Sequence, residues 1–303
     1  MKKKTLLYAI ALLLVAAVSL ASVLPMQKGK ADRSDWMAAL DDAASLRSLT
    51  LPGTHDSGAL HSIADVSGKC QTLSVKEQLK IGVRFLDIRL QLVNNGLKVV
   101  HSFVDQMTDF EDTLADMTDF IRENPSEFLI VSIKEDASPK RSDKNFTDAL
   151  ETMLLSCEEV SRESTLPETV GEARGGIHIL ARYKNASIGL PCYEGWEDDA
   201  AFTLGEIYVQ DNYKVSDAEE KIADVRRTYA VASEEAYALV LNYTSCYLDS
   251  GFPPIYAGLP AHSINRDTKE AMTEVGINGP LGVLVCDFIT SELADVIIGR
   301  NFQ

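Results

Sequence analysis

A short apolar run rich in β-branched residues recurs along this chain, and amphipathic stretches follow several of the runs. This alternation is typical of an α/β fold, in which helices cover a largely parallel sheet. Eight such runs in roughly 270 residues favour a single distorted (β/α)8 TIM barrel over a doubly wound sheet, because no glycine-rich nucleotide loop follows the first run. The predicted strands are residues 46–51, 83–92, 97–101, 128–134, 176–181, 206–210, 238–242 and 281–288.

Three of the connecting stretches have the periodicity of amphipathic helices. The second of them begins with Ser216, which we expect to be the N-cap, and carries Glu219 as its capping-box partner. The strands predicted at 83–92 and 97–101 are joined only by Asn94-Asn95-Gly96, which leaves no room for a helix, so we expect an irregular barrel. The predicted helices are residues 108–122, 216–235 and 264–275.

The first residues have the composition of an export segment. Three lysines at positions 2–4 precede an apolar run that extends from Leu6 to Leu24. A basic segment before an apolar one is typical of a signal peptide, and a run of roughly 18–20 residues is also long enough to remain in the bilayer. We therefore predict that residues 1–31 are a signal peptide or an N-terminal membrane anchor. Residues 32–303 are then one barrel domain, secreted or held on the extracytoplasmic side.

The net charge excludes some classes of partner. The formal charge of the chain is −16, and residues 1–31 contribute five lysines and no acid, so the remainder is still more acidic. Nonspecific nucleic-acid binding depends on phosphate neutralisation by Lys and Arg, so we expect no nucleic-acid partner. The same charge argues against electrostatic adhesion to anionic membranes. The five cysteines match no zinc-binding spacing, and their odd number leaves at least one thiol unpaired.

Polar side chains lie at or just beyond the C-terminal ends of the predicted strands. One of them, His55, lies in the glycine-flanked turn LPGTHDSG, directly before Asp56. Loops at the carboxyl ends of barrel strands converge on one face, where the catalytic groups of such barrels gather. The sequence therefore predicts a common site for His55, Asp87, Arg89, His101, Lys134, Arg182, Asp211 and Asp287.

These residue types suit cleavage of a phosphodiester without a metal. One histidine can take a proton from an attacking hydroxyl, a second can give one to the leaving oxygen, and a guanidinium can hold the phosphate. Asp87 and Arg89 face the same side of a strand, so they form either a structural ion pair or an arginine aimed at phosphate. A carboxylate at the end of a strand, such as Asp287, can orient a histidine and fix its tautomer.

Two further groups are candidates for binding a hydroxyl-rich ring. The carboxylate of Asp211 can accept hydroxyls while the ring of Tyr213 packs on the apolar face, although an ordinary polar strand end would have the same sequence. Lys134 and Arg182 are either members of the site or solvent-exposed charges at the ends of strands.

The segments that carry these residues resemble the bacterial phosphatidylinositol-specific phospholipases C, a family built on the phospholipase C X domain. The resemblance runs in the family's order from about Ser45 to Thr290, and its first and fourth segments are the most specific. The matching segments are LPGTHDSG, VRFLDIRLQ, VVHSF, ENPSEFLIVSIKED, GIHILARY, YVQDNYKVSD, LNYTSC and LGVLVCDFI.

The resemblance implies a distorted TIM barrel that cleaves phosphatidylinositol to diacylglycerol and inositol 1,2-cyclic phosphate. By this match, His55 is similar to the general base acting on the inositol 2-hydroxyl, and Asp287 to its orienting carboxylate. His101 is similar to the general acid, supported by Asp56. Arg89 resembles the phosphate-stabilising arginine, anchored by Asp87. The inositol-binding set implied by the resemblance is Lys134, Arg182, Asp211 and Tyr213.

The resemblance also bears on metals and cofactors. The eukaryotic branch carries calcium ligands, including an Asn directly after the first histidine, where this chain has Asp56. Arg89 occupies a position where calcium-using relatives carry an acid, and a fixed side-chain cation can replace the charge of the metal. We therefore expect calcium independence, no metal ligands and no cofactor.

The expected partner is a phosphatidylinositol-type lipid, free, glycosylated or deacylated. Family members that act on bilayers expose apolar side chains near the active-site rim, but residues 59–73 offer few of them, and Trp196 lies among acidic residues. We expect a monomer with weak peripheral membrane contact. Two alternatives are a glycerophosphodiester phosphodiesterase, which would use paired acidic metal ligands, and a non-catalytic inositol-lipid-binding surface protein.

Overall fold

The computed structural model describes residues 33–303 except 63–67, 103, 250–257, 259 and 275–277. The segment predicted as a signal peptide or anchor, residues 1–31, lies outside the described residues, so that prediction stays untested. Among the residues described, no helix has the length and apolar character needed to cross a bilayer.

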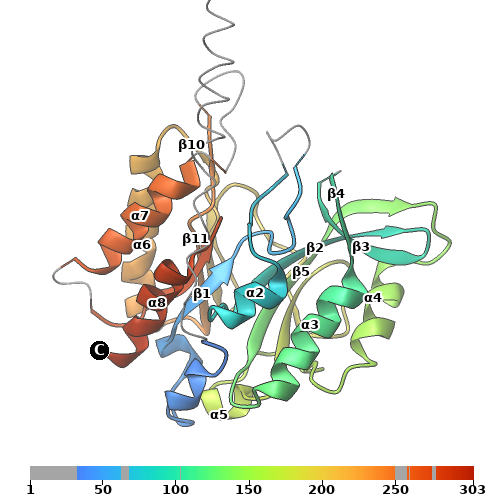
Figure 1. Ribbon diagram of the computed structural model, residues 1–303, viewed down its shortest axis with the longest axis horizontal. Coiled ribbons are helices and arrows are strands. Elements are labelled where there is room, and N and C mark those ends of the chain that lie inside the picture. The colour runs from blue at the N-terminus through green and yellow to red at the C-terminus, as the bar shows by residue number, and fades with distance from the viewer. Residues whose placement is uncertain (1–32, 63–67, 103, 250–257, 259, 275–277) are drawn as a thin grey trace, which may run out of the picture. The chain divides into compact units, whose positions relative to one another are not determined.

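One continuous sheet organises the domain, in the order β7-β6-β5-β2-β1-β13-β11-β9-β8. Every neighbouring pair on this path is parallel except β8 and β9. The sheet is curled and flanked by helices (Figure 1), and in the described chain no pairing joins β7 to β8 to close it. The prediction of a single distorted α/β barrel is confirmed. The strands are β1 Thr50–Thr54, β2 Phe85–Val93, β5 Leu129–Lys140, β6 Ile177–Arg182, β7 Leu190–Pro191, β8 Ala201–Leu204, β9 Ile207–Gln210, β11 Leu239–Tyr243 and β13 Gly282–Cys286.

The irregularity expected after β2 is an antiparallel extension of the sheet. Asn94 and Asn95 both have positive φ, 52° and 65°, the backbone needed for a tight reversal between two strands. The chain therefore returns along β2 as β3 (Gly96–His101) and continues into β4 (Val104–Asp109), so the run predicted at 97–101 is not a parallel barrel strand. A separate parallel pair joins β10 (Lys214–Val215) to β12 (Tyr247–Leu248).

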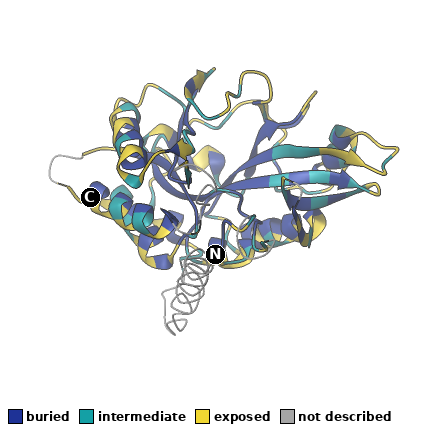
Figure 2. Ribbon diagram, turned by 90° about the horizontal axis from the view of Figure 1, so that it is seen from above, coloured by how far each residue is buried: buried dark blue, intermediate teal, exposed yellow. Residues whose placement is uncertain are grey.

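The helices pack on the outside of the sheet, with buried inner faces and exposed outer faces (Figure 2). The predicted cap of α6 is wrong by one residue. Asp217 is the N-cap and accepts from the backbone N–H of Glu220, while Ser216 donates to the Glu220 carboxylate. The helices are α2 Val75–Lys80, α3 Phe110–Glu123, α4 Phe146–Leu154, α5 Val170–Ala173, α6 Ala218–Ser233, α7 Pro260–Met272 and α8 Ser291–Gly299, with 3-10 turns η1 Trp36–Ala39, η2 Leu46–Ser48 and η3 Arg300–Phe302.

The first predicted strand begins too early. Residues 46–48 form the 3-10 turn η2, and the strand starts only at Thr50. Leu46 and Leu49 are buried because they pack into the barrel interior. The apolar residues of this turn therefore have the same sequence pattern as a buried strand. His262, which the neighbouring prolines led us to expect in a loop, lies instead in α7.

Alternate residues of β2 face opposite sides of the sheet. Leu86, Ile88 and Leu90 belong to the apolar cluster that includes residues of the outer helices, whereas Phe85 belongs to the interior cluster. By the period-two rule, Asp87 and Arg89 continue the interior column above Phe85. The interior is thus apolar at one end and polar at the other.

Candidate active site

The polar end of the interior is built by the same alternation in several strands. Across β2, β5 and β6, Arg89 pairs in register with Lys134, and Lys134 with Arg182. This register therefore places three cationic side chains in one row across three adjacent strands. His55 follows β1 directly and Asp287 follows β13 directly, and these two strands are paired.

A cavity of about 540 Å³ opens over this end of the barrel. Two predicted site residues, Asp56 and Asp87, are fully buried behind it. The other eight line the cavity: His55, Arg89, His101, Lys134, Arg182, Asp211, Tyr213 and Asp287. The structure thus brings together every residue that the sequence predicted for the site.

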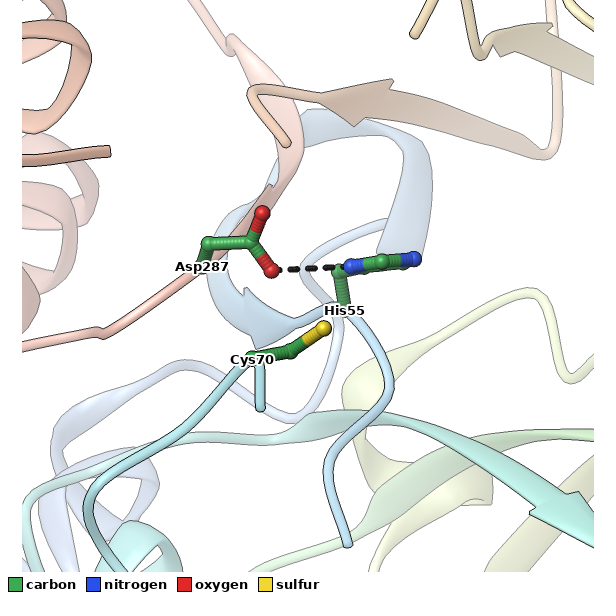
Figure 3. A group of neighbouring side chains, drawn as sticks. All are labelled: His55, Cys70 and Asp287. Atoms are coloured by element: carbon green, nitrogen blue, oxygen red, sulfur yellow. Dashed lines mark hydrogen bonds and ion pairs between the residues drawn. The ribbon is translucent and has the colours of Figure 1, made fainter. Parts of the chain in front are cut away.

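His55 is held through both ring nitrogens. Its Nδ1 lies 2.8 Å from Asp287 Oδ1 (Figure 3), and its Nε2 lies 2.8 Å from a terminal nitrogen of Arg89. A carboxylate accepts and a guanidinium donates, so the neutral ring carries its proton on Nδ1 and accepts at Nε2. The lone pair of the candidate base therefore points toward the candidate phosphate-binding group.

The charges around His55 favour its protonation. Burial lowers the pKa of His55, and Asp287 raises it, with the net result above its ordinary value of 6.5. Asp287 therefore makes the imidazole a stronger base as well as orienting it.

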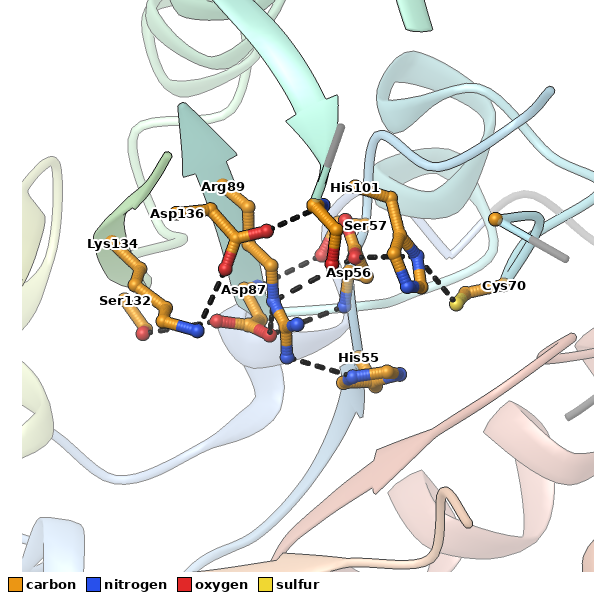
Figure 4. Close-up of polar contacts among 12 residues, drawn as sticks. His55, Asp56, Ser57, Cys70, Asp87, Arg89, His101, Ser132, Lys134 and Asp136 are labelled. Atoms are coloured by element: carbon orange, nitrogen blue, oxygen red, sulfur yellow. Dashed lines mark hydrogen bonds and ion pairs between the residues drawn. The ribbon is translucent and has the colours of Figure 1, made fainter. Parts of the chain in front are cut away.

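Arg89 is anchored by a fully buried carboxylate (Figure 4). Its Nε donates to Asp87 Oδ2 at 3.2 Å. Asp87 also accepts from the backbone N–H of Asp56, from Ser132 Oγ at 3.1 Å and from Arg182 at 3.3 Å. Burial acts to raise the pKa of Asp87, but Arg89 and Arg182 hold it below its ordinary value. Asp87 is thus a permanent anion that fixes the fork of Arg89.

His101 lies on the other side of this cluster. Its Nδ1 is 2.9 Å from Asp56 Oδ2 and 3.5 Å from Cys70 Sγ. Asp56 has a positive φ of 41°, uncommon for a residue other than glycine, which turns the chain just after His55. Two histidines, each beside a buried carboxylate, therefore flank one arginine.

The predicted ring-binding residues line the same cavity. Lys134 is paired with Asp136 at 2.6 Å, and the hydroxyl of Tyr213 donates to Asp198 at 2.8 Å. Burial raises the pKa of Asp211, which has no hydrogen bond to a charged donor among the described side chains. Arg182 lies 3.7 Å from the centre of the Trp196 ring.

Several supporting residues were not found from the sequence. Asp136 lies two residues after Lys134, so the period-two rule could have found it. Trp196, which we considered for membrane contact, instead packs on Arg182. Cys70 comes from the loop after β1, and no sequence pattern indicated that it would lie between the two histidines.

Two groups of side chains in the described structure could ligate a metal ion: His55, Cys70 and Asp287, and Asp56, Cys70 and His101. Both include the thiol of Cys70, and neither is the all-oxygen set that calcium prefers. These donors therefore do not match a calcium site.

Comparisons with known proteins find similar sequences and similar folds. Residues 55–183 match the family described as phosphatidylinositol-specific phospholipase C, X domain. The chain is 23% identical to a 1-phosphatidylinositol phosphodiesterase of Listeria monocytogenes over 90% of this chain and 87% of that protein. It is 27% identical to a protein of the same name from Staphylococcus aureus, over 67% of this chain and 71% of that protein.

Solved structures share the fold. A structure of the Staphylococcus aureus phosphatidylinositol-specific phospholipase C has a TM-score of 0.79 at 24% identity, covering 89% of this chain and 98% of that one. The Listeria monocytogenes structure has a TM-score of 0.71 at 22% identity, covering 89% of this chain and 99% of that one.

Proposed function

We propose that this chain, whose residues 55–183 match the phosphatidylinositol-specific phospholipase C X domain, cleaves phosphatidylinositol. The products are diacylglycerol and inositol 1,2-cyclic phosphate. The observation that carries this proposal is the pair of histidines, each beside a buried carboxylate, on the two sides of Arg89.

In the proposed mechanism, His55 Nε2 takes the proton of the inositol 2-hydroxyl. The resulting oxygen attacks phosphorus, the bond from phosphorus to the diacylglycerol oxygen breaks, and His101 donates a proton to that oxygen. One proton enters His55 and one leaves His101, so the charge of the site is unchanged, and proton exchange with water resets the pair. Water can open the cyclic ester afterwards by the reverse roles.

Arg89 is the proposed stabiliser of the phosphate charge. Its fork is fixed by Asp87, so the donors require little reorganisation as negative charge develops on the non-bridging oxygens. Asp287 keeps the proton of His55 on Nδ1, and Asp56 orients the ring of His101 through its Nδ1.

The inositol ring is proposed to bind between the predicted ring-binding residues. Lys134 and Arg182 supply donors for the ring hydroxyls, Asp211 supplies an acceptor, and Tyr213 supplies an aromatic face. Since the cavity is open, it can also admit a glycosylated head group.

We propose that the reaction is independent of calcium, because the charge of Arg89 stands at the phosphate and both candidate ligand groups among the described residues include the thiol of Cys70 rather than oxygen alone. The protein is proposed to act outside the cytoplasm, secreted or held by residues 1–31. It is proposed to be a monomer that contacts membranes weakly, since its body is acidic.

Phosphorus NMR of the purified full-length protein with phosphatidylinositol in detergent micelles tests this proposal. We expect a cyclic inositol phosphate signal that persists when EDTA is added. Turnover only with calcium would contradict the role given to Arg89, and absence of turnover under both conditions would contradict the proposed reaction.

A further inference from the structure

Cys70 lies between the two halves of the site without a role in the proposed reaction. Its side chain is buried, with 2% of the residue exposed, yet its thiol lines the cavity. Its sulfur is 3.5 Å from His101 Nδ1 (Figure 4). All five cysteines of the chain are free thiols.

The carboxylate of Asp56, like the thiol of Cys70, is buried beside His101. It is fully buried, and neither of its oxygens receives a hydrogen bond. His101 Nδ1 and Arg89 Nε approach one oxygen to 2.9 and 3.6 Å as ion pairs. A buried carboxylate without a hydrogen bond has lone pairs available for a cation.

We propose that Asp56, Cys70 and His101 form a binding site for a thiophilic divalent cation such as Zn²⁺, and that occupation of this site inhibits the enzyme. The carboxylate oxygen, the thiol sulfur and the imidazole nitrogen lie within 4.8 Å of one another. A thiolate, an imidazole and a carboxylate together select zinc over calcium or magnesium.

The observed spacing is close to that of a tetrahedral zinc centre. With ordinary bond lengths, zinc holds its sulfur and nitrogen ligands about 3.5 Å apart and its nitrogen and oxygen ligands about 3.3 Å apart. The observed sulfur–nitrogen distance is 3.5 Å, and the nitrogen–oxygen distance is 2.9 Å. The third pair, Cys70 Sγ and the Asp56 oxygen, lies within 4.8 Å, against about 3.6 Å in such a centre. Side-chain movement on the order of 1 Å or less would therefore complete the three-ligand set, and the cavity supplies an entry path.

The other group, His55, Cys70 and Asp287, is less suited to a cation. His55 Nδ1 and Asp287 already satisfy one another at 2.8 Å, and Arg89 lies against His55 at 2.8 Å. A histidine–carboxylate contact would have to open in either group, since His101 Nδ1 lies 2.9 Å from Asp56. A metal ion at His55 would in addition bind a ring that already accepts a hydrogen bond from the Arg89 guanidinium. Asp56 offers lone pairs that no hydrogen bond uses.

Inhibition follows from the chemistry of His101 and rests on the proposed function. Zinc binds the thiolate and the neutral imidazole, so binding to the protonated His101 releases two protons to solvent, one from the thiol of Cys70 and one from His101 Nδ1, and the metal then occupies the Nδ1 lone pair. The ring can then no longer exist as imidazolium, which is the form that donates a proton to the leaving oxygen. The cation also binds the carboxylate that orients the ring of His101.

Metal binding is measured first, without substrate, on the full-length protein kept reduced by a phosphine. Zinc affinity is obtained by competition with a chromophoric chelator, and Co²⁺ is used to detect a thiolate-to-metal charge-transfer band. We expect one zinc site per chain. In Cys70→Ser, the affinity for zinc should fall at least tenfold and the charge-transfer band of Co²⁺ should disappear. Cys157→Ser, which changes a half-buried thiol at the end of α4, is the matched control and should behave as the unaltered protein.

Two histidine variants separate the two groups. His101→Gln should lose the zinc site, whereas His55→Gln should keep it, and circular dichroism confirms that both are folded. Equal affinity in Cys70→Ser and the unaltered protein would overturn the proposal. So would loss of zinc in His55→Gln with retention in His101→Gln.

Activity is the second readout. Zinc should suppress phosphatidylinositol turnover, EDTA should restore it, and Cys70→Ser should lose less than a third of its own zinc-free rate under the same conditions. Inhibition of Cys70→Ser equal to that of the unaltered protein would overturn the inhibitory role. If no variant turns over phosphatidylinositol, the proposed function fails, but the binding measurements still decide the metal site.

Discussion

The guanidinium carbon of Arg182 lies 3.7 Å from the centre of the Trp196 ring, and the same guanidinium donates to Asp87 at 3.3 Å. The tryptophan therefore holds one arginine of the cavity against the carboxylate that anchors the other, Arg89. A stacked, poorly solvated guanidinium is stabilised by cation–π attraction and restricted to one geometry.

Trp196→Ala should weaken binding of the inositol head group while leaving chemistry nearly unchanged. Loss of a desolvated cation–π contact costs about 2 kcal/mol, so we expect KM to rise roughly 10–30-fold with kcat within about threefold. Steady-state hydrolysis of soluble inositol 1,2-cyclic phosphate measures both. Tyr193→Ala, at the exposed rim of the same cavity, is the control and should change KM little. Equal effects of the two substitutions would show that Trp196 does not position Arg182.

His55→Ala and His101→Ala should each reduce kcat by roughly 10²–10⁴, because each removes one proton-transfer group. The two differ with a substrate whose leaving group is a nitrophenolate, which needs no proton. His101→Ala should recover most of its lost rate on that substrate, and His55→Ala should not. Recovery by both variants, or by neither, would mean that the acid and base roles are assigned wrongly.

Arg89→Lys should be severe although the charge is conserved. An ammonium cannot reach Asp87, His55 and a phosphate with the planar fork of a guanidinium. We expect kcat to fall by roughly 10²–10³, as for removal of one preorganised donor to a developing anion. Lys134→Arg, which changes a neighbouring cation in the same row, is the comparison. A loss of less than about tenfold in Arg89→Lys would indicate that only the charge matters.

The pH profile should report the state of His55. The general base must be neutral, so kcat/KM should fall as the pH drops through the pKa of His55, which lies above 6.5. Burial lowers this pKa and Asp287 raises it, so Asp287→Asn should move the acidic limb to lower pH. The same raised pKa stabilises the fold below pH 6.5, and this contribution is lost as the pH rises through the folded-state value. An acidic limb that moves to higher pH in Asp287→Asn would contradict this account.

A second buried ion pair should control stability rather than activity. Arg84 and Glu127 are both fully buried and lie 2.6 Å apart, below the polar end of the barrel. Glu127→Ala leaves a buried guanidinium charge, so we expect the free energy of unfolding to fall by about 3–5 kcal/mol. Urea denaturation measures this loss. Glu274→Ala, which breaks an exposed pair with Arg226, should cost less than about 1 kcal/mol. Similar costs for the two variants would contradict the role of burial.

The sequence alone determined most of the parallel strands of the sheet and the polar residues at their ends. In β2, apolar Leu86 and Ile88 alternate with Asp87 and Arg89, and this local period assigns the two faces whatever the rest of the fold is. Each polar residue that follows an apolar run is likewise a local observation. Because parallel strands of a barrel end on one face, local patterns were enough to predict a common site.

Only the tertiary structure decided which groups meet around that site. Cys70 reaches His101, and Trp196 reaches Arg182, through loops whose paths have no sequence period. The antiparallel return at Asn94 and Asn95 removed β3 from the barrel and placed His101 beside Asp56. Such contacts join residues far apart in the chain and depend on how loops pack over the sheet. They are set by the free energy of the whole fold, which no local pattern contains.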